Sequence, residues 1–548
     1  METGRAVRHA SIPGGGHDLK NPHHPRRWPR CSGSHYGGAI SRRVRWPRRT
    51  PRRRGGSSAA PWGNLRMTLR VEPFTRTELS RIHGATVRVL ERAGVRVLEP
   101  EAERLLLTAG ARGDADTHIV RIPESVLKEL LLWAPSRFKL FGRSGRREMS
   151  FGEGNVYMSS MGTAVQIEDP DGSVRPPTLK DVETFYRLVD ALPHLDHASW
   201  VVWPRDVPDE LAHVYEVLWG FKHGTKSVDG YNWGHRKAMD TIEIGAIVAG
   251  GLEELEKRPL LLGFANPVSP LTLAKETTEG LLVFARHMQP CTLPPECMSG
   301  GTAPVTVAGT IVQQNAEVLA SVAVAQCARR GSPVFYGSVS TVMDMRTGSV
   351  ALGAPEAGLI ALGAAQLARY YGIPSRGTGG NTEALVEDFQ AGVESATTLL
   401  AAALAGFDFI YDAAGSLESS LTASYAKLIL DHDVCGAVKR IITGIDTSED
   451  ALAEVVIESA GPKGMYLGHS HTLDHFRHEH FAPDVFVRET RAALGSTGRS
   501  LRETAHARAM KIVRDHVVDP LDASVEAKLN AFLKNAAKRN AVLPSVGA

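Results

Sequence analysis

The fold is decided by residues 260–297, which read LLLGFANPVSPLTLAKETTEGLLVFARHMQPCTLPPEC. A short apolar run ends at Asn266 and Pro267, a segment with helical spacing follows, and a second apolar run begins at Cys291. Short apolar runs bounded by turn residues indicate buried strands, and the longer segment between them indicates a connecting helix. This stretch is therefore one strand–helix–strand unit of an α/β protein.

Units of this kind repeat along the chain. We predict eight strands, at 155–161, 198–203, 225–231, 260–265, 291–297, 333–339, 373–378 and 407–412. The predicted helices cover 178–192, 208–222, 235–255, 272–288, 305–330, 354–371, 384–405 and 418–443. Right-handed crossovers can close such a series into a ring of parallel strands. We therefore predict a TIM (β/α)8 barrel over residues 151–445. An open, doubly wound sheet is the alternative, and the presence of eight units favours closure.

The segments on either side of the barrel have different compositions. Residues 67–150 are predicted to form a helical cap, because Thr75 and Glu78 fit a capping box and apolar residues follow at helical spacing. Residues 446–548 are predicted to form a helical extension packed on the barrel. Residues 1–66 contain 14 Arg and one Lys against Glu2 and Asp18, and we expect a disordered tail there. The expected origin of this tail is a wrongly extended start, with Met67 as the true one; a nucleic-acid arm or a targeting peptide is the alternative.

Charge and cysteine content limit the classes of partner. The whole chain carries a net charge of +3 and the tail +13, so the remaining residues carry −10 and give no reason to expect nucleic acid. No apolar run reaches the roughly 20 residues that span a bilayer, so we expect no membrane partner. The five cysteines are irregularly spaced, which suits a reducing cytoplasm.

The active site of such a barrel is built from the loops after the strands. The residues expected there are aromatic, amide, acidic and glycine residues with few Lys or Arg: Tyr157, Trp203, Tyr231, Phe264, Asn266, Gly300, Gly301, Thr302, Tyr336, Asp344, Asn381 and Glu383. Aromatic faces combined with carboxylates suit a methylated ammonium group better than a phosphate. The sequence alone therefore indicates a barrel enzyme for a small, cationic substrate.

Three motifs allow more than one interpretation. The loop Gly300–Thr306 can present backbone N–H groups to an anion, or it can be a close-packed turn. The glycines of Gly377–Asn381 favour a site where the backbone approaches a ligand closely. The histidine-rich segment His469–His480 can bind metal, but we interpret it as a solvated or packing segment and predict no metal site.

Several collinear motifs resemble one known family. They are Met298-Ser-Gly-Gly-Thr-Ala-Pro-Val-Thr-Val-Ala-Gly309, Asn315-Ala-Glu317, Asp344-Met-Arg-Thr-Gly348, Gly353-Ala-Pro-Glu356, Asp388-Phe-Gln-Ala-Gly392 with Glu394, and His471-Thr-Leu-Asp-His-Phe-Arg477. In these motifs the chain resembles the trimethylamine methyltransferase family over about residues 70–540. The resemblance implies a TIM barrel that moves a methyl group from a methylated amine to the cobalt of a separate, small corrinoid protein, as part of one-carbon metabolism of the kind found in methanogenesis.

The resemblance also bears on the cofactor. A corrinoid-binding motif of the Asp-x-His-x-x-Gly type is not found: the nearest sequence, Asp116-Thr-His118, has Arg121 where glycine is needed. We therefore expect no directly bound cofactor, with the corrinoid (cobalamin) supplied by the partner protein.

The chain departs from the family at one position that bears on the choice of substrate. Archaeal trimethylamine enzymes carry pyrrolysine, and the matching position here is expected near Asn381, where the chain has only ordinary residues. The pyrrolysine-lacking members are similar to glycine betaine methyltransferases. We therefore predict a quaternary, betaine-like substrate, because a quaternary nitrogen is already activated as a leaving group.

The expected roles follow from these interpretations. Asn381 and Glu383 contact or orient the substrate, and Glu356 and Asp344 add negative potential or hold loops, although Glu356 beside Pro355 equally fits a helix N-terminal carboxylate. We expect the cation cage to consist of Tyr157, Trp203, Tyr231 and Phe264. We expect a substrate carboxylate or the corrinoid edge to meet Gly300, Gly301 and Thr302.

Two alternatives stay open: a non-catalytic binder of methylated amines, and a corrinoid-independent lyase or hydrolase that uses Glu383 with a histidine. We also expect a cytoplasmic homo-oligomer.

Overall fold

The structure, a computed structural model, describes residues 69–114, 116–145, 147–490, 492 and 500–541. The basic tail expected over residues 1–66 lies outside them. Eight strands form the central sheet: β6 (Tyr157–Met158), β9 (His197–Ala198), β10 (Ser227–Asp229), β11 (Leu261–Phe264), β13 (Cys291–Leu293), β15 (Val334–Gly337), β18 (Ser375–Thr378) and β19 (Phe409–Tyr411). Each of them overlaps one of the eight predicted strands.

The sheet is a closed ring. Its strand order is β6-β19-β18-β15-β13-β11-β10-β9, and every neighbouring pair is parallel. A parallel bridge between Ser159 and His197 joins the two outer strands. The predicted TIM barrel is thus confirmed, and the open, doubly wound alternative is wrong.

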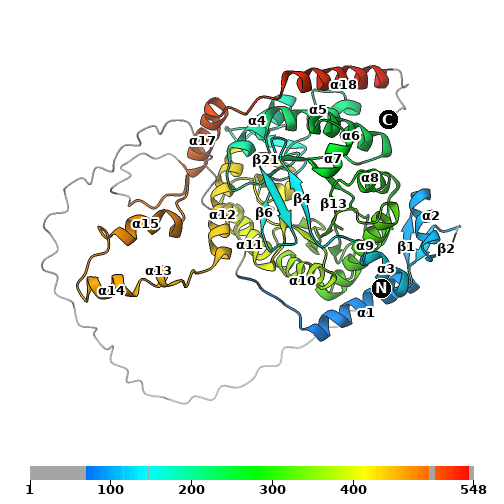
Figure 1. Cartoon of the computed structure of the whole chain (residues 1–548), viewed down its shortest axis with the longest axis horizontal. Coiled ribbons are helices and arrows are strands. Elements are labelled where there is room, and N and C mark those ends of the chain that lie inside the picture. Colours follow the sequence, from blue (N-terminus) through cyan, green and yellow to red (C-terminus); the bar gives the residue numbers. More distant parts are fainter. Residues whose placement is uncertain (1–68, 115, 146, 491, 493–499, 542–548) are drawn as a thin grey trace, which may run out of the picture. The chain divides into compact units, whose positions relative to one another are not determined.

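Helices surround the ring (Figure 1). They are α4 (Leu179–Ala191), α5 (Asp209–His223), α6 (His235–Ala249), α7 (Leu252–Lys257), α8 (Lys275–Arg286), α9 (Val307–Ala328), α10 (Pro355–Tyr371), α11 (Phe389–Ala405) and α12 (Tyr425–Thr443). The single helix predicted over 235–255 is divided into α6 and α7. Gly250 and Gly251, at φ of 94° and 148°, adopt a conformation that other residues rarely take and so end α6.

A hairpin of β4 (Phe138–Phe141) and β5 (Glu148–Phe151) fills the amino-terminal end of the barrel. Phe151 packs edge-on against Phe335, Tyr157 and Phe409, at ring-centroid distances of 4.8, 5.3 and 6.1 Å. These three rings come from the first or second residue of their strands. An eight-stranded barrel has just enough interior for side chains, so the hairpin closes this end and leaves the carboxyl end for function.

The region expected to be a helical cap also contains strands. It comprises α1 (Arg76–Arg92), α2 (Pro100–Thr108) and α3 (Glu124–Leu131), together with β1 (Val95–Val97), β2 (Arg112–Asp114) and β3 (Ile119–Arg121). The predicted capping box of Thr75 and Glu78 begins α1. Strand β1 pairs with β12 (Thr272–Leu273), which precedes α8, and this sheet fastens the region to the barrel.

The C-terminal region has two parts. Helix α17 (Leu501–Asp515) packs against α12 and α4, and α18 (Ala523–Ala541) packs against α5 and α6. Before them come α13 (Glu449–Leu452), α14 (Glu454–Ala460) and α15 (Ser470–Glu479), in which no residue is buried. Within the described ranges, no helix combines the length and the apolar character that crossing a membrane requires.

Candidate active site

The loops after the barrel strands form two small sheets at the carboxyl end. One contains β14 (Met298–Ser299), β16 (Thr341–Met343) and β17 (Val350–Ala351). The other contains β7 (Gln166–Glu168), β8 (Val174–Arg175), β20 (Ser416–Leu417) and β21 (Thr422–Ser424). Since active sites of such barrels are built from these loops, we call the barrel interior that they surround the mouth.

A buried polar network lies inside the barrel below the mouth. Asp229, the last residue of β10, accepts a hydrogen bond from the Tyr411 hydroxyl at 2.6 Å. Its other carboxylate oxygen lies 2.8 Å from His197 Nε2, and His197 Nδ1 lies 2.8 Å from the Ser227 hydroxyl. Because all four side chains are almost fully buried, the network holds a carboxylate in place inside the barrel.

Arg376 of β18 adds a cation to this interior. Its guanidinium lies over the Tyr411 ring at 4.6 Å and over the Phe264 ring at 5.5 Å. Its Nη1 donates to the Ser338 carbonyl at 3.3 Å. Its Nε is buried and has no hydrogen-bond partner among the described residues. The interior therefore contains one cation that the sequence interpretation did not place there, and its guanidinium already covers part of the predicted cage residue Phe264.

Carboxylates outnumber this guanidinium. Asp412, Asp229 and Glu296 all act electrostatically on Arg376. Asp412 accepts from the Gly162 N–H and the Thr378 hydroxyl, both at 3.0 Å. Burial raises the pKa of Asp412, while Arg376 opposes that rise. The interior thus carries three carboxylates for one guanidinium.

Glu296 is a site residue that the sequence interpretation did not identify. Its side chain is exposed to solvent, yet desolvation by surrounding protein raises its pKa, with Asp412 adding to the rise and Arg376 reducing it. The Glu296 side chain is thus reached by solvent while neighbouring protein removes part of its hydration, as in a surface depression. Glu296 therefore lies at the solvent-exposed side of the charged group that contains Asp412 and Arg376.

Three aromatic side chains gather beside the network. Trp200 stacks on Tyr231 at 5.2 Å, and Trp203 lies 5.7 Å from Tyr231 and 6.4 Å from Trp200. The Trp200 indole N–H donates to the Asp229 carbonyl at 3.2 Å, which ties this cluster to the polar network. The structure brings together the predicted Trp203 and Tyr231 and adds Trp200. Lys237 Nζ lies 5.4 Å from the Tyr231 ring.

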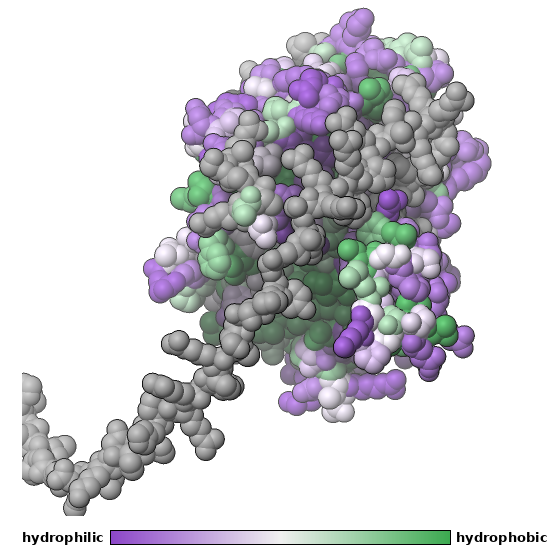
Figure 2. All heavy atoms as spheres, turned by 90° about the vertical axis from the view of Figure 1, so that its left-hand side faces the viewer, coloured by the Kyte–Doolittle hydropathy of each residue, from purple (hydrophilic) through white to green (hydrophobic). Residues whose placement is uncertain are grey.

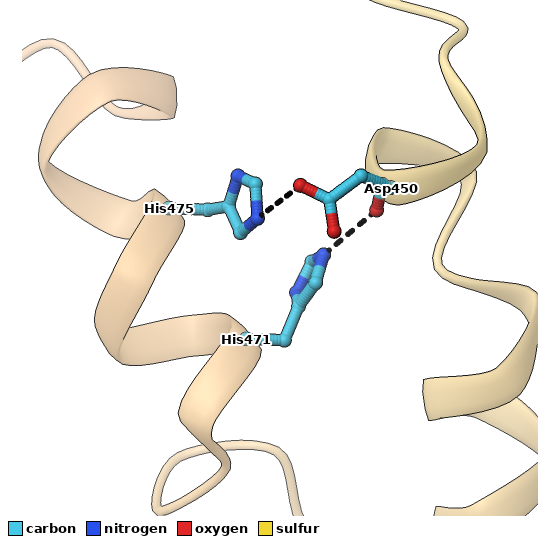
Figure 3. Close-up of side chains that lie close together, drawn as sticks. All are labelled: Asp450, His471 and His475. Atoms are coloured by element: carbon cyan, nitrogen blue, oxygen red, sulfur yellow. Dashed lines mark hydrogen bonds and ion pairs between the residues drawn. The ribbon is translucent and has the colours of Figure 1, made fainter.

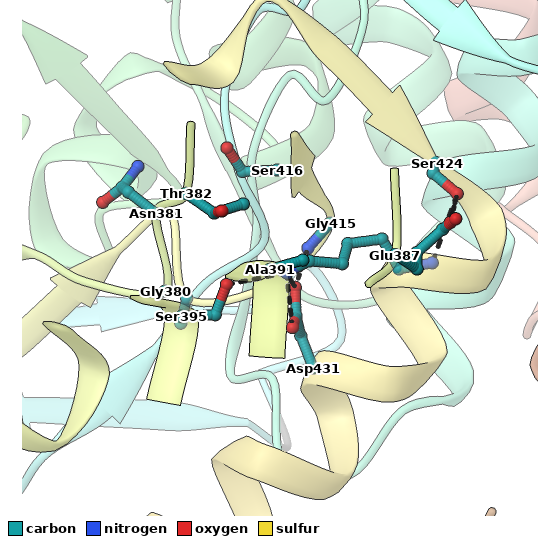
Figure 4. A network of polar contacts seen from close by, with 12 residues as sticks. Gly380, Asn381, Thr382, Glu387, Ala391, Ser395, Gly415, Ser416, Ser424 and Asp431 are labelled. Carbon is teal, nitrogen blue, oxygen red and sulfur yellow. Dashed lines mark hydrogen bonds and ion pairs between the residues drawn. The ribbon is translucent and has the colours of Figure 1, made fainter. Parts of the chain in front are cut away.

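The loop after β18 contains the predicted Asn381 and Glu383 (Figure 4 labels Gly380, Asn381 and Thr382). Asn381 is fully buried; its Oδ1 accepts from Thr378 at 3.1 Å and its Nδ2 donates to Ser420 at 3.3 Å. Glu383 Oε1 accepts from the Gly353 N–H at 2.8 Å. Burial raises the pKa of Glu383, and Glu394 adds to the rise. Both side chains hold rim loops together.

A buried ion pair supports the same loops. Lys427 Nζ donates to both Asp431 oxygens, at 2.7 and 2.6 Å, and to the Ser395 hydroxyl at 2.9 Å. Asp431 also accepts from the Gly415 N–H at 2.9 Å. Figure 4 shows Asp431 pointing toward Gly415, beside Ser395. This pair fixes the loop after β19 to α12 and α11.

Two predicted aromatic residues do not reach the mouth. Tyr157 begins β6 and accepts from the Ser150 N–H of the hairpin at 3.0 Å, so it belongs to the closed end of the barrel. Tyr336 follows the inward-facing Phe335 and therefore faces outward, where its hydroxyl donates to Asn315 of α9 at 3.0 Å. The predicted place of Tyr157 in the cation cage is therefore wrong, and so is the predicted place of Tyr336 at the rim.

The predicted rim residues outside the mouth interior have local roles. The backbone N–H groups of Gly300, Gly301 and Thr302 bond within their own loop, to the carbonyls of Ala303 and Met298. Asp344 closes its turn and pairs with Arg346 at 2.8 Å. Glu356 lies in the first turn of α10, as the helix-terminus interpretation expects. Asn266, after β11, keeps a buried Oδ1 without a partner in the described structure and so remains available to a donor.

A cavity of about 460 Å³ lies between α4, α12 and α17. Its lining includes His194, His432, Arg508 and Lys511. His194 comes from the loop that precedes β9. Because the functional end of a barrel is the one after the strands, this cavity is not part of the candidate site.

The C-terminal helix α17 reaches two rim loops through Arg502. Its guanidinium pairs with Glu168 of β7 at 2.8 Å and with Glu387 at 3.0 Å. Burial, followed by the nearby Glu387, raises the pKa of Glu168 to about 7, against the opposing effect of Arg502. Folded Glu168 therefore binds its proton more tightly than the unfolded chain does.

This group gives a testable pH dependence. Between its unfolded pKa and about 7 the folded chain binds more protons, so the contribution of Glu168 to the free energy of unfolding falls as pH rises. We expect Glu168→Gln to remove this fall. Relative to the variant, the wild-type chain should lose on the order of 2 kcal/mol between about pH 5 and 8, measured by thermal unfolding. Asp171→Asn, on the same hairpin, is the control, and an unchanged pH profile for E168Q would refute the assignment.

Comparison with known proteins agrees with the geometry. The sequence matches the family described as Trimethylamine methyltransferase (MTTB) over residues 42–544. The chain belongs to this family. It is 34% identical to glycine betaine methyltransferase of Desulfitobacterium hafniense strain Y51, over 85% of this chain and 97% of that protein. It is 33% identical to trimethylamine methyltransferase MttB of Methanosarcina barkeri strain Fusaro, over 85% and 95%. The class of enzyme is therefore methyltransferase.

Among solved structures, the chain is similar to the monomethylamine methyltransferase (MtmB) of Methanosarcina barkeri. The sequence identity is 12%, the TM-score is 0.45, and the similarity covers 85% of this chain and 88% of that chain.

Proposed function

We propose that this chain transfers a methyl group from a quaternary, betaine-like amine to the Co(I) of a separate, small corrinoid protein. The observation that carries the proposal is the charge of the mouth, where three carboxylates surround one guanidinium beside aromatic rings. A quaternary ammonium has no N–H group to donate, so it is bound by aromatic faces and by negative potential. Both are available at this position.

Arg376 supports a substrate that also carries a carboxylate. A buried guanidinium with an unpartnered Nε can pair with an anion, and such charge-assisted hydrogen bonds are strong. A betaine combines a carboxylate with a quaternary nitrogen and so matches Arg376 and Glu296 together. The relative named glycine betaine methyltransferase is consistent with this choice. The ordinary, fully buried Asn381 near the expected pyrrolysine position argues against trimethylamine.

The chemistry requires little from the protein. The electron pair of Co(I) attacks the methyl carbon, the cobalt–carbon bond forms and the carbon–nitrogen bond breaks. The bonding pair stays on nitrogen, which leaves as a neutral tertiary amine, and no proton moves. The protein therefore acts by alignment and by excluding water. We assign cation binding to Glu296, Trp203 and Tyr231, and positioning of the rim loops to Asn381 and Glu383.

We place the docking face for the corrinoid partner around the mouth. Five large apolar side chains project from the rim loops, and we call them the apolar rim: Val305, Met345, Leu385, Val386 and Phe389. Phe389 is 87% exposed, Val305 68% and Leu385 67%. Exposed apolar side chains gathered on one face mark an interaction surface. The rim would allow a partner to bring its cobalt to the substrate while water is displaced.

This docking face predicts the effect of Phe389→Asp. A charge at the centre of an apolar contact should raise the KM for the corrinoid protein by roughly tenfold or more. Amine binding should stay unchanged, because Phe389 lies on the outside of the rim. Leu132→Asp, at the residue that follows α3 and is 78% exposed, is the matched control. If both variants behave like the wild type in steady-state assays, the partner docks elsewhere.

A calorimetric panel separates this proposal from its alternatives. Betaines, carnitine, choline and methylamines are titrated into the purified chain, and each ligand that binds is then tested for turnover with and without the corrinoid protein. We expect quaternary amines to bind and to react only with the partner present, and free cobalamin to bind weakly. Binding without any methyl transfer would indicate a non-catalytic binder. Turnover without a corrinoid would indicate a lyase or hydrolase. Cytoplasmic location and homo-oligomerisation stay predictions.

A further inference from the structure

Three potential metal ligands meet in the C-terminal region, away from the mouth residues. Asp450 lies in α13, and His471 and His475 lie in α15. His475 Nε2 is 3.0 Å from Asp450 Oδ2, and His471 Nε2 is 3.1 Å from the Asp450 backbone carbonyl. Figure 3 shows both imidazoles directed at Asp450 from one face of α15. The two imidazole nitrogens and a carboxylate oxygen all lie within 4.8 Å of one another.

The spacing of the two histidines is suited to chelation. Residues four apart lie on the same face of a helix, one turn above each other, and this pair has its rings 4.2 Å apart. Two histidines at this spacing, completed by a carboxylate from another element, are a recurrent zinc ligand set. The sequence interpretation weighed metal binding at these histidines but did not include Asp450, because only the fold brings Asp450 of α13 to α15.

Apart from the contacts of Glu479 in α15 with Arg440 of α12, the segment that contains these residues has few interactions that hold it together. Helices α13, α14 and α15 have no buried residues, and Leu452, Val455 and Leu467 are 59%, 76% and 73% exposed. Hydrophobic residues are visible among hydrophilic ones on the face shown in Figure 2, which is the side where these helices lie in Figure 1. A short segment without a core commonly relies on a metal ion or another crosslink.

We propose that Asp450, His471 and His475 bind one zinc ion that fastens α13 to α15. Imidazole nitrogen and carboxylate oxygen favour Zn²⁺ over the hard ions Mg²⁺ and Ca²⁺. Zinc bonds of about 2.0–2.1 Å bring the ligands closer than they lie without the ion, so the side chains rotate inward on binding. A water molecule fills the fourth position. His469 is not a ligand, because its Nδ1 accepts from the His471 N–H at 3.1 Å.

The competing interpretation is a plain contact, in which protonated His475 pairs with Asp450 and no metal binds. Both interpretations involve the same side chains, but only the metal site predicts that zinc binds and that its affinity depends on pH. A metal site binds deprotonated imidazoles, so zinc affinity should increase from about pH 6 to 8. A simple contact between His475 and Asp450 predicts that no zinc binds at either pH. The site is independent of the proposed methyl transfer.

The test is zinc titration of the full, untagged chain after chelator treatment, followed by calorimetry at about pH 7.5. We expect one equivalent to bind, with on the order of 100-fold weaker binding in His471→Ala/His475→Ala and intermediate affinity in Asp450→Asn. His478→Ala, on the same helix but outside the cluster, is the matched control and should bind like the wild type. Zinc should also slow proteolysis between residues 444 and 487 in the wild-type chain but not in the double variant.

Because the three ligands lie on exposed helices, these substitutions remove no core contact and the variants should fold. Methyl-transfer activity does not test the site, because α13 and α15 contain none of the residues assigned to the mouth. The readouts are zinc affinity and protection from proteolysis. A chelated wild-type chain that takes up no zinc would overturn the proposal. So would a double variant that binds zinc as tightly as the wild type, because the ion would then be held by other residues.

Discussion

Replacing Glu296 by Gln is expected to raise the KM for a quaternary amine by roughly 30- to 100-fold and to change kcat by less than about threefold. In the proposed function the carboxylate faces the positively charged substrate in the mouth, so its loss weakens binding of the ground state. During methyl transfer the nitrogen loses its positive charge. The transition state therefore needs Glu296 somewhat less than the bound substrate does, so kcat should not fall and should rise by less than about threefold.

The comparison that isolates this effect is Asp344→Asn, which neutralises another rim carboxylate. Asp344 contacts Arg346 and the backbone of its own turn, so the KM for the amine should stay within about twofold of the wild-type value. Steady-state kinetics at a fixed, saturating concentration of the corrinoid protein give both constants. A large fall in kcat for E296Q with an unchanged KM would contradict the assigned role, because Glu296 would then act in the chemical step.

Replacing Lys427 by Met should lower the free energy of unfolding by about 3–5 kcal/mol. Lys427 and Asp431 are 2% and 3% exposed, and Met leaves the Asp431 carboxylate buried without its cation. An uncompensated buried charge is among the most destabilising single changes in a protein. The loop after β19 should loosen as well, because Asp431 also holds the Gly415 N–H. Thermal and chemical unfolding of the purified variant measure the loss.

Two further variants test the cause. Lys427→Met/Asp431→Leu removes both charges and should recover most of the lost stability, since apolar replacement of a buried pair is often neutral. Lys257→Met breaks the exposed pair with Glu254 and should change stability by less than about 1 kcal/mol. If K427M unfolds at the wild-type midpoint, or if the double variant is no better than K427M, the ion pair does not support this region.

Much of the barrel could be predicted from sequence because each unit is a local pattern. Residues 260–265 and 333–339 are apolar runs bounded by turn residues, and β11 and β15 lie within them. Closure was predictable only from the number of units, since the bridge from Ser159 to His197 joins distant parts of the chain. The strand predicted over 198–203 fits least well: β9 ends at Ala198, and Trp200 and Trp203 lie in the loop.

The site was harder to predict because it depends on which way each side chain points. Arg376 lies inside an apolar strand prediction, and only the pairing of β18 with its neighbours turns it into the barrel. Tyr336 is one residue from the inward-facing Phe335, and this single step directs it to Asn315 instead of the mouth. Glu296 was included in a predicted strand, although Pro294 and Pro295 end the strand and begin the loop.

The central claim is that the mouth presents a quaternary amine to the cobalt of another protein. The most direct measurement mixes the purified chain, its corrinoid partner reduced to Co(I), and glycine betaine, and follows the visible spectrum of the corrinoid. The account predicts conversion to methyl-Co(III) that requires both the chain and the amine, with a neutral tertiary amine as the second product. A cobalt that stays Co(I) with every quaternary amine tested, while trimethylamine methylates it, would contradict the account.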